Sequence, residues 1–118
     1  MKVLHDKDSS EARLQLNCIV RDYGTEENVN SARVSIAQGD YPYDHYSVNT
    51  TVTLTVAVES GSGKIVVKDG DIYALKSGDV VSIPAMMPYR YIQCQGLEAV
   101  LFSSHPAWTT DQYKEISL

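Results

Sequence analysis

Tyrosine, histidine and small polar residues recur at every second position in two short segments of the chain. They are Tyr41, Tyr43, His45 and Ser47 in the first segment, and Tyr89, Tyr91 and Gln93 in the second. In an extended strand, residues spaced by two lie on one face. An imidazole has an ordinary pKa near 6.5, so His45 could transfer protons at neutral pH, with Tyr43 or Tyr89 as a proton donor opposite. We therefore take His45 and Tyr89 as the catalytic candidates.

The sequence around these segments alternates in a way that is typical of β-strands. Runs rich in β-branched residues are separated by glycine-containing turn signals, which predicts seven or eight short strands in an all-β sandwich or barrel. The predicted strands include 14–20, 32–37, 52–59 and 98–104. The "SGSG" of residues 60–63 and the "QG" of residues 95–96 are interpreted as turns. In the run from 52 to 58, the even-numbered aliphatic residues should face inward and the threonines outward.

The C-terminal tail carries the only helical signal. Thr109 is followed three residues later by Gln112, the spacing of a capping box, which predicts a short helix there. Trp108 is the only tryptophan of the chain. It is expected to dock the tail onto the barrel.

Composition limits the class of protein. A chain of 118 residues suffices for one domain, residues 1–118. Its formal charge of −5 and its lack of a Lys/Arg cluster argue against nucleic acid or an anionic membrane as a partner. Because no apolar run approaches the roughly 18 residues of a membrane span and the first residues are charged, we expect a soluble cytoplasmic protein. Cys18 and Cys94 are expected to be free, partly buried thiols.

Two segments resemble the paired motifs of the cupin superfamily. Gly39 and His45 have the glycine-to-histidine spacing of the first motif, and the stretch from Gly78 to Pro84 matches the Gly-Asp, five residues, proline of the second. The resemblance covers about residues 32–108. It implies a double-stranded β-helix, a jelly-roll barrel of the RmlC-like type, in agreement with the strand count.

The chain departs from the cupin motifs at the metal ligands. Such relatives hold a metal with two histidines and a glutamate from the first motif and a histidine from the second. Here only His45 matches, because Ser47 and Tyr89 replace two of the histidines. Further replacements at motif positions are Leu54 (or Thr51, Val52 or Thr53) for the glutamate, Met86 for a glycine and Gln93 for an asparagine. A divalent metal needs at least three converging ligands, so we expect neither a metal nor another cofactor.

If His45 and Tyr89 face the barrel interior as in those relatives, a polar-rimmed apolar pocket results. The expected ligand-binding residues are Tyr41, Tyr43, Ser47, Met86, Tyr91 and Gln93. The alternative is a packed plug, because small barrels fill their interiors with side chains. Arg90, between the two tyrosines, should point outward and pair with an acid or a second subunit.

Three functions are open at this point. The first is metal-independent binding of a small molecule such as a carbohydrate. A catalytic version would be a metal-free sugar isomerase or epimerase. Such cupins orient their histidine with a buried carboxylate, whereas the nearest acid here, Asp44, is expected to face the other way. The second is a non-catalytic sensor or dimerisation module, and we expect a homodimer paired through the outer threonine face. A metal-dependent dioxygenase or isomerase is disfavoured by the ligand count.

Overall fold

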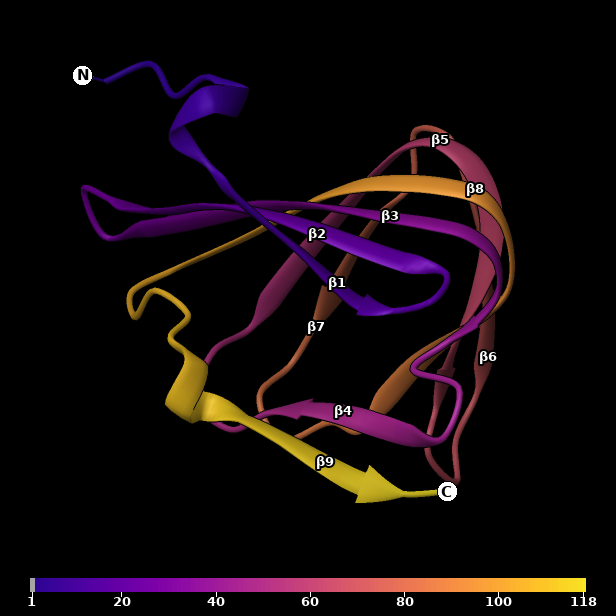
Figure 1. The fold of residues 1–118 in the computed structure, drawn as a ribbon. Helices are drawn as coiled ribbons and strands as arrows, with labels where there is room; N and C mark the ends of the chain where they lie inside the picture. The colour runs from indigo at the N-terminus through magenta and orange to yellow at the C-terminus, as the bar shows by residue number, and fades with distance from the viewer. Residues whose placement is uncertain (1) are drawn as a thin grey trace.

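The computed structural model describes residues 2–118, and strands dominate it (Figure 1). The elements in chain order are η1 (Asp6–Asp8), β1 (Ser10–Gln15), β2 (Cys18–Glu26), β3 (Val29–Tyr41), β4 (His45–Asn49), β5 (Leu54–Val67), β6 (Ile72–Lys76), β7 (Val80–Ile83), β8 (Tyr89–Ser104), η2 (Thr110–Gln112) and β9 (Tyr113–Ser117). Both η elements are single 3-10 turns.

The strands form one sheet that curls into two facing layers. Along the sheet the order is β1-β2-β3-β8-β4-β9, and β5 pairs with β8, β6 and β7. The long strands β5 and β8 pass from one layer to the other, so β7 pairs with the first half of β5 and β6 with its second half. As a result, the β1–β2 edge and the β4–β9 edge lie on opposite sides of the curled sheet (Figure 1).

The bends of β5 and β8 lie where the sequence predicted turns. Gly61 has a φ of +78° and Gly96 a φ of +57°, within continuous strands. A Cβ on Gly61 would lie 2.0 Å from the carbonyl oxygen of Gly96, so only glycine permits this crossing. The prediction that "SGSG" and "QG" are turns between strands is therefore wrong. Both are mid-strand bends that let one strand serve two layers.

The prediction of one strand over residues 14–20 is also wrong in part. β1 ends at Gln15 and β2 begins at Cys18, so Leu16 and Asn17 form the tip of a hairpin. The Asn17 side chain fixes this tip by donating 2.9 Å hydrogen bonds to the Gln38 and Asp40 carbonyls.

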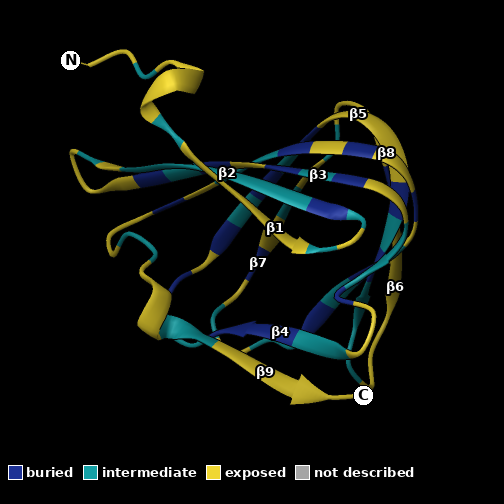
Figure 2. Cartoon of the chain, viewed as in Figure 1, coloured by how far each residue is buried: buried dark blue, intermediate teal, exposed yellow. Residues whose placement is uncertain are grey.

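The core lies between the two layers and follows the alternation of the strands (Figure 2). Val52, Leu54, Val56 and Val58 are all buried, which confirms the predicted inward face of this run. Full burial of such a side chain contributes about 1.5–3 kcal/mol. Cys18 and Cys94 are buried free thiols in the same core.

The C-terminal tail is not the short helix that the sequence predicted. Only η2 turns, and Thr109 makes no side-chain cap bond to the backbone. The chain then continues as β9, which pairs antiparallel with β4. The reason is tertiary: the free edge of β4 offers backbone hydrogen bonds that a local capping signal cannot match. Within residues 2–118 there is no helix with the length and apolar character needed to cross a membrane.

Candidate binding and proton-transfer site

A cavity of about 370 Å³ is lined by residues of both the β1–β2 edge and the β4–β9 edge. Its volume is within the range of roughly 300–1,000 Å³ that is usual for small-molecule sites. Aliphatic side chains form most of the wall, and phenol, indole, carboxamide, hydroxyl and carboxylate groups supply the polar points. The lining residues are Ser10, Ala12, Leu14, Val20, Asp22, Asn30, Ala32, Asn49, Leu54, Tyr89, Leu101, Trp108, Thr110 and Tyr113. The barrel interior is therefore open at this mouth, and it is packed deeper in, around Tyr91.

His45 is the first residue of β4 and lies beside the wall that Tyr113 forms. Its Nδ1 is 2.8 Å from Asp44 Oδ1, and its Nε2 is 3.2 Å from the Tyr113 hydroxyl. Glu115 Oε1 lies 3.4 Å from the same Nε2. In the tautomer whose proton is on Nδ1, His45 donates to Asp44 and its Nε2 accepts the Tyr113 proton. The side chain of His45 is only 16 % exposed.

Asp44 places a carboxylate on His45 Nδ1, and its side chain is 55 % exposed rather than buried. We expected it to face away from His45, and this is wrong. Strand β3 ends at Tyr41 and β4 begins at His45, so Asp44 belongs to a loop in which strand alternation does not apply. The hydrogen bond from His45 lowers the pKa of the Asp44 carboxyl below its ordinary value. The carboxylate therefore stays ionised at neutral pH beside the imidazole.

Arg90 holds the loop that presents Asp44. Its Nε donates to the Pro42 carbonyl at 3.0 Å and its terminal nitrogen to the Tyr43 carbonyl at 3.2 Å. The same nitrogen lies 3.4 Å from Asp40 Oδ2, which confirms the expected pairing of Arg90 with an acid. Arg90 thus acts on the site by positioning the loop.

Tyr113 connects His45 to the cavity. Its hydroxyl lies 3.0 Å from Ser47 Oγ in addition to its bond with His45, while its ring lines the cavity. Asn49 is the register partner of Tyr113, and Ser47 that of Glu115, so these side chains share one face of the β4–β9 pair. Burial raises the pKa of the Tyr113 phenol above its ordinary value, so it is a neutral donor at physiological pH.

Tyr89, Asn49 and Trp108 form a second polar group on the cavity wall. The Trp108 indole N–H donates to Asn49 Oδ1 at 2.9 Å, and the Trp108 backbone N–H donates to Ser103 Oγ at 2.9 Å. These bonds confirm that Trp108 docks the tail, and its ring is also part of the wall. Burial raises the pKa of Tyr89, which also has a side-chain hydrogen bond with Asn49. Tyr89 therefore remains a neutral phenol beside the cavity.

Of the other side chains expected in the pocket, some face the interior and some do not. Ser47 and Tyr91 are buried, and Tyr41 packs against the core. Burial raises the pKa of both tyrosines. Their predicted ligand-binding roles stay predictions, because neither they nor Ser47 line the cavity directly.

Tyr43, Met86 and Gln93 point away from the interior, so placing them in the pocket was wrong. Tyr43 is 63 % exposed and Met86 64 % exposed, and Gln93 is also exposed. Tyr43 and Met86 lie in loops between strands. Gln93 is an irregular residue of β8 with a φ of +51°, after which Cys94 takes the inward position. The rule that residues spaced by two lie on one face of a strand fails wherever a loop or a bulge interrupts the strand.

No motif or spacing in the sequence pointed to Tyr113, Asn49 or Asp22 as wall residues. Tyr113 and His45 are 68 residues apart, and no motif joins them. They meet only because the tail returns as an edge strand against β4.

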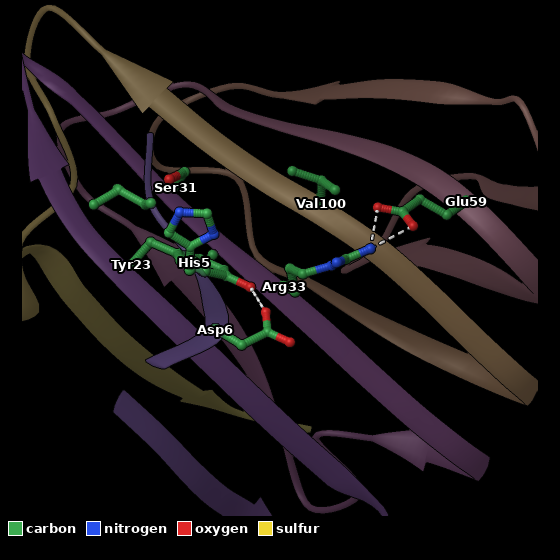
Figure 3. Close-up of a pocket in the computed structure, with 9 residues that line it drawn as sticks. His5, Asp6, Tyr23, Ser31, Arg33, Glu59 and Val100 are labelled. Carbon is green, nitrogen blue, oxygen red and sulfur yellow. Dashed lines mark hydrogen bonds and ion pairs between the residues drawn. The ribbon is translucent and has the colours of Figure 1, made fainter. Parts of the chain in front are cut away.

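A second hollow lies where the N-terminal segment around His5 and Asp6 packs beside β2 and β3 (Figure 3). Its charges are paired with one another. The Tyr23 hydroxyl donates to Asp6 at 2.8 Å, and one terminal nitrogen of Arg33 contacts both oxygens of Glu59 at 2.7 and 2.6 Å. His5 borders this hollow without the acid and phenol partners that His45 has. The cavity beside Tyr113 is therefore the stronger candidate site.

Comparisons with known proteins give a structural match only. No protein-family model matches the chain, and no curated protein matches it either. Pac13, a nucleoside dehydratase from Streptomyces, is 18 % identical with a TM-score of 0.82, and the match covers 100 % of this chain and 92 % of that one. An RmlC-like cupin from Shewanella frigidimarina is 15 % identical with a TM-score of 0.71 over 91 % of each chain. KdgF from Halomonas is 10 % identical with a TM-score of 0.73, over 93 % of this chain and 98 % of that one.

This chain has the cupin fold. The resemblance noted in the sequence motifs is thereby confirmed at the level of the fold. With sequence identities of only 10–18 %, these matches establish the fold alone. The function has to be argued from the side chains of the site.

The side chains of this chain do not fit the metal that the motifs hold in cupins with a metal. Across residues 2–118, no three His, Cys, Asp or Glu side chains come together in a way that could hold a metal ion. His45 already uses Nδ1 on Asp44 and Nε2 on Tyr113, and the neighbouring Ser47 hydroxyl is engaged with Tyr113 as well. Neutral hydroxyls and phenols with raised pKa values are poor ligands for divalent ions.

Proposed function

We propose that this cupin binds a small polar ring-shaped molecule, a sugar or a nucleoside, and that His45 moves a proton on it through Tyr113 without a metal. The observation that supports this most is the chain Asp44–His45–Tyr113, which runs from a carboxylate through an imidazole to a phenol on the cavity wall. The apolar wall with the Trp108 indole suits the flat face of a ring, and the phenols suit its hydroxyls.

The proton balance of such a step is simple. As a ligand group loses a proton to the Tyr113 oxygen, the phenol passes its own proton to Nε2 of His45. The resulting imidazolium is stabilised by Asp44 at Nδ1 and by Glu115 near Nε2. Transfer through a neutral phenol avoids a free phenolate, which burial disfavours. The reverse movement returns the proton to the ligand.

Tyr89 is the second phenol available to the ligand. It is tied to Asn49, which in turn holds Trp108, so its hydroxyl is fixed on the cavity wall. In this proposal Tyr89 donates a hydrogen bond to a ligand oxygen, whereas Tyr43, the alternative donor, is exposed and outside the cavity.

The structural neighbours support the choice of ligand class. Pac13 is a nucleoside dehydratase, and variants of it with a single histidine or tyrosine replaced have been solved with uridine. The match to Pac13 covers 100 % of this chain and 92 % of Pac13. We carry over only the class of ligand.

Binding can be read from the single tryptophan. Trp108 is the only tryptophan of the chain and its indole N–H lies at the cavity, so ¹H–¹⁵N spectra show one indole signal that reports on the site. We expect uridine or D-ribose to shift this signal in a saturable way at millimolar concentration. If no saturable shift appears with either probe, the proposed ligand class is wrong.

Proton transfer needs its own test. D-ribulose carries C–H bonds next to a carbonyl, and their exchange in D₂O can be followed by NMR without knowing a product. We expect His45→Gln to slow this exchange about 10²–10⁴-fold, the usual contribution of a general acid–base group. Tyr43→Phe serves as the matched control and should leave the rate unchanged. If the wild type and His45→Gln show equal exchange rates, the proposed proton transfer by His45 is wrong, and only the proposed binding remains.

A further inference from the structure

The cavity wall opposite Tyr113 carries one carboxylate. Asp22 on β2 lies directly across from Ser10 on β1, and both line the cavity. Asp22 Oδ1 accepts the Gly24 backbone N–H at 2.7 Å. Its other oxygen has no hydrogen-bond partner among the described residues, so it is available to a ligand.

Within the part of the chain that the structure describes, this carboxylate has no basic side chain beside it in the cavity. Among residues 2–118, no Lys or Arg side chain lines the cavity. The basic residues of the same two strands are engaged elsewhere: Arg13 donates to the Leu16 carbonyl, and Arg21 bonds Ser9 and Glu11. The acids nearest the other wall, Asp44 and Glu115, add negative charge beside His45.

We propose that the cavity accepts only ligands without a negative charge, with Asp22 as the specificity-determining residue. This rests on the function proposed above and narrows its ligand class to nucleosides and free sugars, excluding nucleotides, sugar phosphates and uronic acids. Asp22 accepts hydrogen bonds from ligand hydroxyl or N–H groups, for which a carboxylate is a strong partner.

The physical basis is the cost of bringing an anion into a cavity to which residues 2–118 contribute no Lys or Arg side chain. A phosphate or carboxylate loses water there and gains no ion pair. Repulsion from a single carboxylate at about 6 Å, with an effective dielectric constant of about 20, lowers affinity roughly 100-fold. The chain's formal charge of −5 acts in the same direction at long range.

The test compares uncharged and phosphorylated forms of the same probes, read from the Trp108 indole signal. In the wild type, uridine and D-ribose should bind at least about 30-fold more tightly than uridine 5′-monophosphate and D-ribose 5-phosphate. Asp22→Asn keeps an oxygen for the Gly24 N–H and should reduce the preference about tenfold or more. Glu98→Gln removes the same charge from an exposed position on another strand and should leave the preference unchanged.

A second variant keeps the proposal testable should Asp22→Asn not fold. Ser10 is exposed on the edge strand β1, so Ser10→Lys should be tolerated, and it should improve binding of the phosphorylated probes. If the phosphorylated probes bind the wild type as tightly as the uncharged probes, the proposed selection against negative charge is wrong. The proposed binding site would still stand. A selective wild type whose preference is the same in Asp22→Asn would overturn the role of Asp22. Failure of every probe to bind would overturn the proposed function, and the selection with it.

Discussion

Replacing Tyr113 by phenylalanine removes one oxygen from the centre of the proposed proton path. The ring and its packing are retained, while the hydrogen bonds to His45 Nε2 and to Ser47 Oγ are lost. His45 can turn to Glu115 or water, whereas Ser47 is 4 % exposed and its hydroxyl has no other partner among residues 2–118. The penalty should therefore come mainly from Ser47.

The size of this penalty can be worked out. Leaving a buried hydroxyl unpaired costs about 1–3 kcal/mol. For 118 residues, an unfolding entropy of about 2.1 cal/mol/K per residue gives about 0.25 kcal/mol/K. The melting temperature of Tyr113→Phe should thus fall by about 4–12 °C. Tyr43→Phe, at an exposed tyrosine, should change it by less than about 2 °C.

Thermal and urea unfolding of a double-mutant cycle measure the effect directly. In a Ser47→Ala background the hydroxyl of residue 47 is already absent, so Tyr113→Phe should cost at least about 0.5 kcal/mol less there than in the wild type. Additive effects within about 0.3 kcal/mol, or a Tyr113→Phe variant as stable as the wild type, would refute the pairing of Ser47 with Tyr113 and with it the path to His45.

Two further predictions concern the fold itself. Gly61→Ala should lower the free energy of unfolding in urea by at least about 3 kcal/mol more than Gly24→Ala. Both glycines have a positive φ, but only at Gly61 would the added Cβ clash with a backbone atom, the carbonyl oxygen of Gly96. Equal losses of stability would contradict the crossing of β5 over β8. Burial raises the pKa of Cys18 to about 12 and of Cys94 to about 11, so each thiol is held protonated in the folded state. This stabilisation is complete below the ordinary thiol pKa near 9 and is lost as the pH rises through the folded-state value. In a reducing buffer, unfolding free energy should therefore fall by about 1 kcal/mol per pH unit per thiol above pH 9, and less steeply in Cys18→Ala; parallel curves would show that Cys18 is not buried.

Alternation in the sequence was sufficient for the strands that have one buried face. The run from Val52 to Val58 shows this best, because aliphatic and polar residues must separate when one face of a strand meets the core. The cupin motifs predicted that His45 and Tyr89 face the barrel interior; Tyr89 is buried and lines the cavity, whereas His45 lies beside the cavity wall. That residues 1–118 are a single domain, that the chain forms a homodimer and that it is cytoplasmic stay predictions.

Alternation could not foresee where a strand bends or stops. Gly61 and Gly96 look like turns in the sequence because glycine with a positive φ serves both turns and mid-strand bends. Asp44 and Met86 were assigned to strand or motif positions although they lie in loops. At Asp44 this error hid the carboxylate that orients His45.

The sequence by itself determined an all-β barrel whose motif positions carry other residues in place of most of those that hold a metal in similar proteins. Only the tertiary structure decided which groups meet there. Tyr113 contacts His45 because the tail fills the free edge of β4, and Asp22 faces the same cavity because the sheet curls until its two edges lie opposite each other. Both contacts depend on backbone pairing between segments far apart in the chain, which local residue patterns do not encode.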